Sequence, residues 1–344
     1  LASPGIPGFQ AAGPFAAVAE RLREYNFEVL EKDISGMWAM QSQMQGMPAA
    51  PEPSDEEIKN AVWIVLDIPS RRSPMGPPPS IAAKLADHLK AGGSALVLAT
   101  PQSDNLAAAL DEWGVKIHTD IIAVHELIKT PGAQTADVIE DIQRQPYMFV
   151  LNNYGDHPLA KPLKSLDGLM FPMLAVETSP KAGYKATPLL PIPQTLKTWG
   201  ESDVDAVLAN QPVEYNPPKG ADRLGDLTPP LFGGAVVEKE DGNGRLVVIG
   251  TLNFAVNVIV NYPDLRFQRP VARFPGNSEL FCNSALWLSK MEPMLAISPA
   301  AMEVSRIRDI APGALQFWRV GVLLIALPGM VILAGIVMYF ARRD

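Results

Sequence analysis

Apolar and polar positions along the first half of the chain follow the periods of strands and helices in turn. Two uninterrupted apolar runs, Ala61–Leu66 and Ser94–Ala99, are typical of strands that are buried on both faces. Between them, Ile81–Lys90 has helical spacing and ends at a pair of glycines. A short helix at Asn105–Trp113 and a third strand at Val115–Ile117 follow. Strands and helices that alternate at this spacing predict βαβ units and a parallel sheet covered by helices.

Further elements are predicted on both sides of this unit. Ser54 and Glu57 have the spacing of a capping box and predict the start of a helical turn. Pro180–Pro230 is rich in proline, so we expect an irregular segment there. The other predicted elements are helices at Phe15–Tyr25 and Asn277–Lys290, a helical turn at Pro158–Lys164, and strands at Phe27–Leu30, Tyr147–Leu151, Gly168–Val176 and Arg245–Gly250.

The last apolar run, Val320–Phe340, is much longer than the others. It holds 21 residues without a charge, and at about 1.5 Å per helical residue it matches a hydrocarbon core roughly 30 Å thick. A buried core helix is the alternative, but such helices are usually shorter and carry a polar face. We therefore expect a transmembrane helix, with a kink at Pro328 in its middle.

Aromatic and basic residues flank this run, as interfacial anchors do in membrane helices. They are Trp318 and Arg319 before the run, and Tyr339, Arg342 and Arg343 at its end. The adjacent arginines at 342 and 343 favour a cytoplasmic C-terminus. The large soluble part is then expected outside the cytoplasm.

Composition narrows the classes of function. The formal net charge of −8 and the pI near 5.2 argue against nucleic-acid binding, which normally leaves a basic footprint. The single cysteine, Cys282, excludes an intrachain disulfide, and its place within a predicted amphipathic helix favours a core residue over a nucleophile. The chain begins at Leu1, so an N-terminal membrane segment is neither shown nor excluded.

Motifs for common chemistries are missing from the sequence. It contains no phosphate-binding P-loop, no GxGxxG turn after the first strand, and no HExxH zinc motif. The four histidines lack the mutual spacing of metal ligands. We therefore expect no metal, no cofactor and no catalytic residue.

Several polar and aromatic residues at strand and loop ends are candidates for ligand or partner binding. The ends of parallel strands are where α/β proteins bind ligands, which singles out Asp67, Ser103 and Asp104. Three later clusters add Tyr154 and His157, then Trp199 and Glu201, then Asn253. Each candidate is also a residue type that caps helices or satisfies turns, so the structural interpretation stays open beside the functional one.

The order of these motifs resembles a known family. The segments AVWIVLDIP, YGDHPLAKPL, LKTWGES, GRLVVIGTLNFAVN and FPGNSELFCNSALWL, followed by the apolar helix, are similar to the auxiliary component of gliding-motility-type (GldG-like) ABC transport systems. The resemblance covers nearly the whole chain from about Phe15. It implies an amidotransferase-like or flavodoxin-like α/β fold, with a parallel sheet and helices on both faces. It also implies a non-enzymatic, membrane-anchored accessory subunit that works beside an ABC permease and ATPase.

The expected organisation has three parts. Residues 1–145 form an α/β sheet domain, residues 146–312 form a second α/β portion that completes the soluble domain, and residues 313–344 form the transmembrane helix with a short tail. The soluble domain is expected on the periplasmic side of a bacterial inner membrane, where it binds a partner or a ligand such as a carbohydrate. Two alternatives remain: a structural subunit of another large membrane complex, and a hydrolase that uses Glu201, Asp203 and Asp205.

Overall fold

The computed structural model describes residues 13–32, 53–66, 81–101, 106–127, 145–164, 166–194, 197–217, 225–264, 271–295 and 317–342. The chain divides into a compact unit, Leu1–Ala301, and a second unit, Met302–Asp344, which contains the apolar helix. Strands from both sides of the expected boundary at residues 145 and 146 join in one sheet of the first unit. The two predicted α/β portions therefore belong to one compact body.

A five-stranded mixed sheet lies at the centre of this unit, in the order β1-β2-β10-β9-β7. Its strands are β1 (Val62–Leu66), β2 (Ser94–Leu98), β10 (Arg245–Ile249), β9 (Phe232–Lys239) and β7 (Tyr184–Pro191). The first three are parallel, as the sequence predicts, whereas β9 and β7 are antiparallel to their neighbours. The connection from β9 to β10 is a tight turn, which is far too short for the crossover that parallel neighbours need.

Two smaller antiparallel sheets complete the strand pairing of the described residues. In one, β3 (Val115–His125) lies between β6 (Leu174–Thr178) and β8 (Thr198–Glu201). In the other, β4 (Phe149–Leu151) pairs with β5 (Gly168–Met170). The predicted strand at Gly168–Val176 is thus two strands in different sheets.

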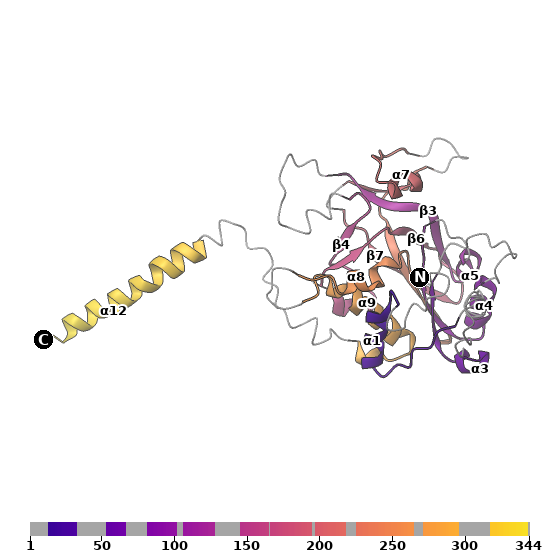
Figure 1. Cartoon of the computed structure of the whole chain (residues 1–344), viewed down its shortest axis with the longest axis horizontal. Helices are drawn as coiled ribbons and strands as arrows, with labels where there is room; N and C mark the ends of the chain where they lie inside the picture. Colours follow the sequence, from indigo (N-terminus) through magenta and orange to yellow (C-terminus); the bar gives the residue numbers. More distant parts are fainter. Residues whose placement is uncertain are drawn as a thin grey trace, which may run out of the picture. The chain divides into compact units, whose positions relative to one another are not determined.

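Helices cover both faces of the central sheet, as expected (Figure 1). Helices α4 (Ile81–Lys90) and α5 (Ala107–Asp111) pack in the same apolar core as alternate residues of β2, including Val97. The other residues of β2, including Leu96, pack in a second core with α1 (Ala16–Glu24) and α9 (Pro275–Leu288). The apolar run at β2 is therefore explained by burial on both faces.

Helix α9 is enclosed by the rest of the unit, because 13 of its 14 residues are buried. Pro275 begins the helix, where the missing N–H of proline costs nothing. Asn277 is fully buried, and its side chain forms three hydrogen bonds: its Oδ1 accepts from the N–H of Leu169 (2.8 Å), and its Nδ2 donates to the carbonyl oxygens of Leu169 (2.9 Å) and Phe254 (2.8 Å). These bonds fix α9 to β5 and to the loop after β10.

The remaining elements of this unit are short. They are α3 (Asp55–Ile58), η1 (Lys161–Leu163), α7 (Val204–Leu208), η2 (Asn253–Ala255), α8 (Asn257–Val260) and η3 (Glu292–Met294). The capping box of Ser54 and Glu57 is confirmed at α3. The predicted strand at Phe27–Leu30 is wrong, because these residues form no strand. The prediction of an irregular Pro180–Pro230 is also wrong, since β7, β8 and α7 lie within it.

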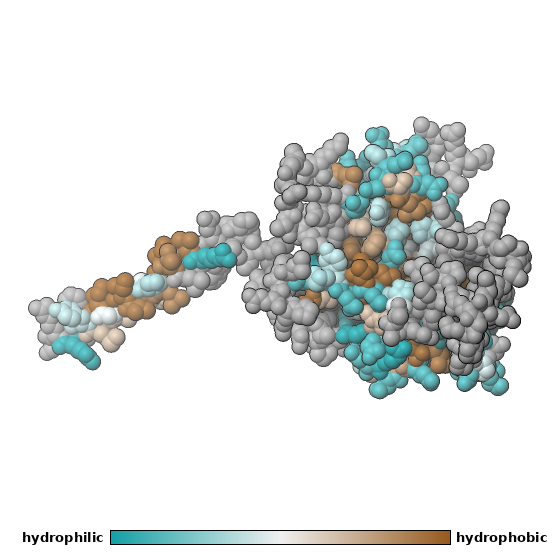
Figure 2. All heavy atoms as spheres, in the orientation of Figure 1, coloured by the Kyte–Doolittle hydropathy of each residue, from teal (hydrophilic) through white to brown (hydrophobic). Residues whose placement is uncertain are grey.

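The second unit contains one long apolar helix. Residues Phe317–Ala326 form a π-helix (η4), and Leu327–Ala341 continue as an α-helix (α12) in which Pro328 is the second residue. The stretch Arg319–Tyr339 is long and apolar enough to cross a membrane. Figure 2 shows apolar side chains along this helix, with hydrophilic residues near its two ends.

The predicted anchors lie at these ends of the helix. Arg319 and Tyr339 are exposed, and Arg342 directly follows α12. Trp318 lies within η4, although its side chain is not described, and Arg343 lies outside the described residues.

Substitution of Asn277 with leucine should strongly destabilise the first unit. The variant leaves the N–H of Leu169 and two carbonyl oxygens buried without their partner, at a cost of about 1–3 kcal/mol for each unsatisfied group. We expect a loss of at least about 3 kcal/mol in urea unfolding of the detergent-solubilised chain. Ser278→Ala is the matched control, because Ser278 is half-buried and bonds only to Pro275 within its own helix; it should cost less than about 1 kcal/mol. Equal losses for both variants would contradict the role given to Asn277.

Candidate functional site

Tyr154 is fully buried and serves as a packing residue of the core. Its hydroxyl donates to the carbonyl oxygen of Leu166 at 3.1 Å. Gly276, in the first turn of α9, makes room for this ring, since a Cβ there would lie 1.8 Å from the Tyr154 hydroxyl. Tyr154 is therefore enclosed by protein atoms and holds the chain before η1 against the N-terminal end of α9.

His157 lies three residues further on and reaches the opposite end of α9. Its ring meets the Trp287 ring edge to face, with 4.9 Å between the centroids. The Nδ1 atom accepts a hydrogen bond from the N–H of Leu159 (3.4 Å), as a neutral imidazole can. Burial lowers the pKa of His157 from 6.5 to about 4, against the opposing effect of Glu238. His157 is therefore neutral at physiological pH and acts as part of the packing around Trp287.

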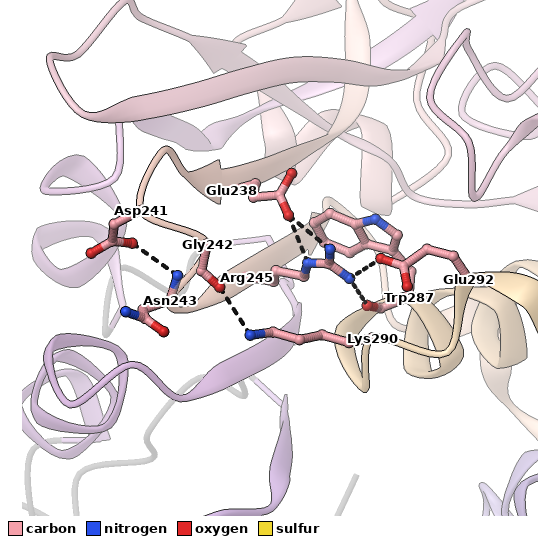
Figure 3. A network of polar contacts seen from close by, with 8 residues as sticks. All are labelled: Glu238, Asp241, Gly242, Asn243, Arg245, Trp287, Lys290 and Glu292. Carbon is pink, nitrogen blue, oxygen red and sulfur yellow. Dashed lines mark hydrogen bonds and ion pairs between the residues drawn. The ribbon is translucent and has the colours of Figure 1, made fainter.

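Arg245, at the start of β10, lies at the centre of the polar network in Figure 3. Its Nε donates to Glu238 Oε1 at 2.9 Å, and its Nη2 lies 2.8 Å from the same oxygen. Its Nη1 donates to the carbonyl oxygen of Trp287 (2.6 Å) and pairs with Glu292. The guanidinium also stacks over the Trp287 ring, 4.6 Å from the centroid. All of these partners belong to the protein itself, so the guanidinium group of Arg245 is taken up by contacts within the fold.

The same network closes the C-terminal end of α9. Lys290 has a left-handed backbone, with φ of 59°, and its N–H donates to Trp287 O at 3.0 Å, while the N–H of Met291 donates to Leu286 O at 2.9 Å. This is a Schellman arrangement that ends the helix. The Lys290 ammonium then donates to Gly242 O (2.9 Å) in the turn between β9 and β10. The cations of Arg245 and Lys290 thus lie where the helix dipole favours positive charge.

Trp199 and Glu201 form a second cluster, on β8. Both are buried, and Trp199 Nε1 donates to Glu201 Oε2 at 3.0 Å, while the N–H of Asp203 donates to Oε1 at 2.9 Å. Asp203 caps α7 by accepting from the N–H of Ala206 (3.0 Å). Buried Asp226 is a further carboxylate here, which accepts from the N–H and hydroxyl of Ser202 and from the N–H of Asn216. These carboxylates hold the backbone turns between β8 and α7.

Asn253 lies after the carboxyl end of β10, at the sheet edge where a ligand site is expected. Its N–H donates to the Thr251 hydroxyl (3.2 Å), which itself donates to Phe171 O (3.0 Å). The N–H of Leu174 donates to Gly250 O at 2.8 Å, and a Cβ at Gly250 would lie 2.6 Å from Leu174 O. The chain between β5 and β6 therefore covers the carboxyl end of β10.

Contacts within the described part of the chain do not bring all of its candidate residues together. Trp199 and Glu201 are in contact, while Tyr154 and His157 lie at the two ends of α9. Asp67, Ser103 and Asp104 lie outside the described residues. Among the described residues, no group of three or more histidine, cysteine, aspartate or glutamate side chains could hold a metal ion.

Cys282 is a core residue, as the sequence predicts. It is buried in α9, and burial raises the pKa of its thiol to about 12. A thiol with so high a pKa carries almost no thiolate at neutral pH.

The contacts identify residues that sequence reasoning missed. Arg245, Glu292, Asn277 and Asp226 all make polar contacts with segments that are distant in the chain. Arg245, the first residue of an otherwise apolar strand, could have indicated such a contact from the sequence, because a charge at that place needs a partner. Three of the five segments on which the resemblance is based, those around Tyr154, Gly250 and Asn277, meet around α9, and these contacts are structural.

Comparisons with known proteins identify no family for the chain. No family model matches it, and no curated protein matches it. Four chains of solved structures match. One is titled "mmIFT52 N-terminal domain"; it has 13% sequence identity and a TM-score of 0.43, and the match covers 83% of this chain and 95% of that chain.

Arg245→Lys should loosen the C-terminal end of α9. Lysine keeps the charge but cannot bond Glu238, Glu292 and Trp287 O together, nor stack its planar group on the ring. We expect a loss of about 2 kcal/mol in the free energy of unfolding. Arg23→Lys is the control, since Arg23 makes an exposed pair with Glu20 and should change stability by less than about 0.5 kcal/mol. A loss at Arg245 no larger than at Arg23 would contradict the network.

His157 should make the unfolding free energy depend on pH between about 6.5 and 4. Its pKa is lower in the folded state, so the unfolded state binds the proton first, and stability is full above 6.5 and falls toward pH 4. Allowing for solvent screening at this half-buried site, the loss should reach about 2 kcal/mol. Urea unfolding at pH 7 and pH 4.5 measures it. His157→Asn removes the titrating group, so an unchanged pH dependence in this variant would rule the attribution out.

Proposed function

We propose that this chain is a membrane-anchored accessory subunit of an ABC-type transport system, whose α/β unit binds a partner or a ligand outside the cytoplasm. The observation that carries the proposal is the helix Arg319–Tyr339, which is long and apolar enough to cross a membrane and is joined to a compact α/β unit. A helix of this length and apolar character supports a membrane location for the chain.

The contacts favour binding over catalysis as the mode of action. The alternative, a hydrolase that uses Glu201, Asp203 and Asp205, needs carboxylates that face a substrate. Here both oxygens of buried Glu201 accept hydrogen bonds from Trp199 and Asp203, and Asp203 caps α7. Glu201 is thus fully engaged within the fold, and one oxygen of Asp203 is used to cap α7. The proposal therefore assigns recognition to outer surfaces of the unit.

The family resemblance supports the transport context. The motifs around Tyr154, Gly250 and Asn277 occur in the order of the auxiliary component of gliding-motility-type ABC systems, and the apolar helix follows them. The partners would then be a multi-span permease and an ATPase with a P-loop. The bacterial inner membrane, with the soluble unit on the periplasmic side, is the location that the arginine pair after the helix favours.

The helix limits where the soluble unit can act. The described part of the first unit ends at Leu295 and the helix begins at Phe317. A fully extended chain of about 20 residues reaches roughly 70 Å. Partners of the α/β unit are therefore expected close to the membrane, where the extracytoplasmic parts of a permease would lie.

Purification of the tagged full-length chain from its native membrane in mild detergent tests this function. We expect an ATPase and a permease to be recovered with it in comparable amounts. The control variant carries an unrelated transmembrane helix of equal length in place of residues 320–340. If the native helix packs on the permease, this variant should stay in the membrane but recover at least several-fold less permease. Recovery with a respiratory or secretion complex, and with no ATPase, would overturn the proposal.

A further inference from the structure

The two edges of the five-stranded sheet differ in how they are protected. β1 and β7 are the outermost strands, so each has a row of backbone N–H and C=O groups on its outer side. Among the described residues, the backbone of Val62–Leu66 forms hydrogen bonds with β2 and with no other segment. The outer edge of β1 is thus unpaired in this part of the chain.

The opposite edge, β7, carries several features that prevent strand pairing. Pro188 and Pro191 have no N–H to offer to a further strand. The N–H of Leu190 is already bonded to Tyr154 O at 3.1 Å. Lys185 is exposed on the same strand, and a charge at an edge opposes aggregation. Natural proteins use such devices where an edge must stay alone, and the described strand Val62–Leu66 has no proline, no charge and no outer backbone hydrogen bond of this kind.

The side chains of β1 suit a pairing with an identical strand. The sequence of the strand is VWIVL, without a charge, a proline or a glycine, and four of its five side chains are only partly buried. An antiparallel pair related by a two-fold axis at Ile64 places Val62 of one copy opposite Leu66 of the other, so apolar residues meet apolar residues. No charge is brought into the new pair.

The membrane anchor makes a second copy the readily available occupant. Copies that are held in one bilayer by Arg319–Tyr339 have their α/β units confined near the same membrane surface. A connection that reaches roughly 70 Å lets these units meet. Confinement of this kind raises the effective concentration of like units. A partner with a different strand would have to match an uncharged apolar edge equally well.

We propose that β1 is a dimerisation edge, at which two copies of this chain join their central sheets through antiparallel β1–β1 pairing. The pairing satisfies the outer backbone groups of Val62–Leu66 and makes one continuous sheet across the dimer. It rests on the membrane anchoring proposed above but not on the transport partners, because it concerns the purified chain without other subunits.

Cysteine cross-linking of the full chain in detergent tests this pairing. Cys282 is the single cysteine and is buried, so an introduced thiol is the reactive one. Facing residues across antiparallel strands have Cα atoms about 4.5–5.5 Å apart, within the range of a disulfide. Ile64→Cys should therefore give a covalent dimer on mild oxidation. Thr187→Cys, on the protected edge strand β7, is the matched control and should give at least tenfold less covalent dimer.

Mass measurement by light scattering provides an independent readout. The wild-type chain should have the mass of a dimer after subtraction of detergent, and Ile64→Lys, which places two like charges opposite each other, should weaken dimerisation at least tenfold. Circular dichroism checks that this variant folds; if it does not, the cysteine result decides. A wild-type monomer, equal cross-linking at positions 64 and 187, or a different protein bound at β1 would each overturn the proposal.

Discussion

The burial of helix α9 is the constraint on which the rest of the first unit depends. A helix with 13 of 14 residues buried leaves no side for water, so each polar side chain on it must find a partner in the protein. Asn277 bonds to β5 and to the loop after β10, and buried Glu279 accepts a hydrogen bond from Arg21 of α1 (2.6 Å). Segments from the beginning, middle and end of the chain are therefore fixed around one helix.

This arrangement explains the contacts that the candidate residues Tyr154 and His157 make within the fold. The segment of Tyr154 and His157 runs from the N-terminal end of α9 to its C-terminal end, and Arg245 closes the C-terminal end through Trp287. Polar residues that hold a core together are constrained as strictly as a binding site, because an unsatisfied buried group is costly. Among the described residues, the features that we propose for work with other molecules are outer ones: the edge strand β1 and the apolar helix.

The sequence predicts most of the elements of the first half, because their periodicity is clear and local. The capping box at Ser54, the strands β1 and β2, and helices α1 and α4 all occur where expected. Three local features misled the prediction elsewhere. Phe27–Leu30 has strand-like residues but pairs with no strand in the described part of the chain. Pro188 and Pro191 suggested a loop, although an edge strand tolerates proline. The polar residues of α9 indicated a solvent-facing side, whereas hydrogen bonds to distant segments satisfy them, and no local pattern encodes such bonds.

Native-state hydrogen exchange of the amides of α9 tests the central claim most directly. If the whole unit is organised around this helix, its central amides, near Leu280 to Ser284, should exchange only through global unfolding and be the slowest in the chain. Their exchange should speed up in Asn277→Leu by the same factor as the amides of β2 and β10. Amides of α9 that exchange faster than those of β2, or that respond to the substitution alone, would show that the helix opens independently and would contradict this account.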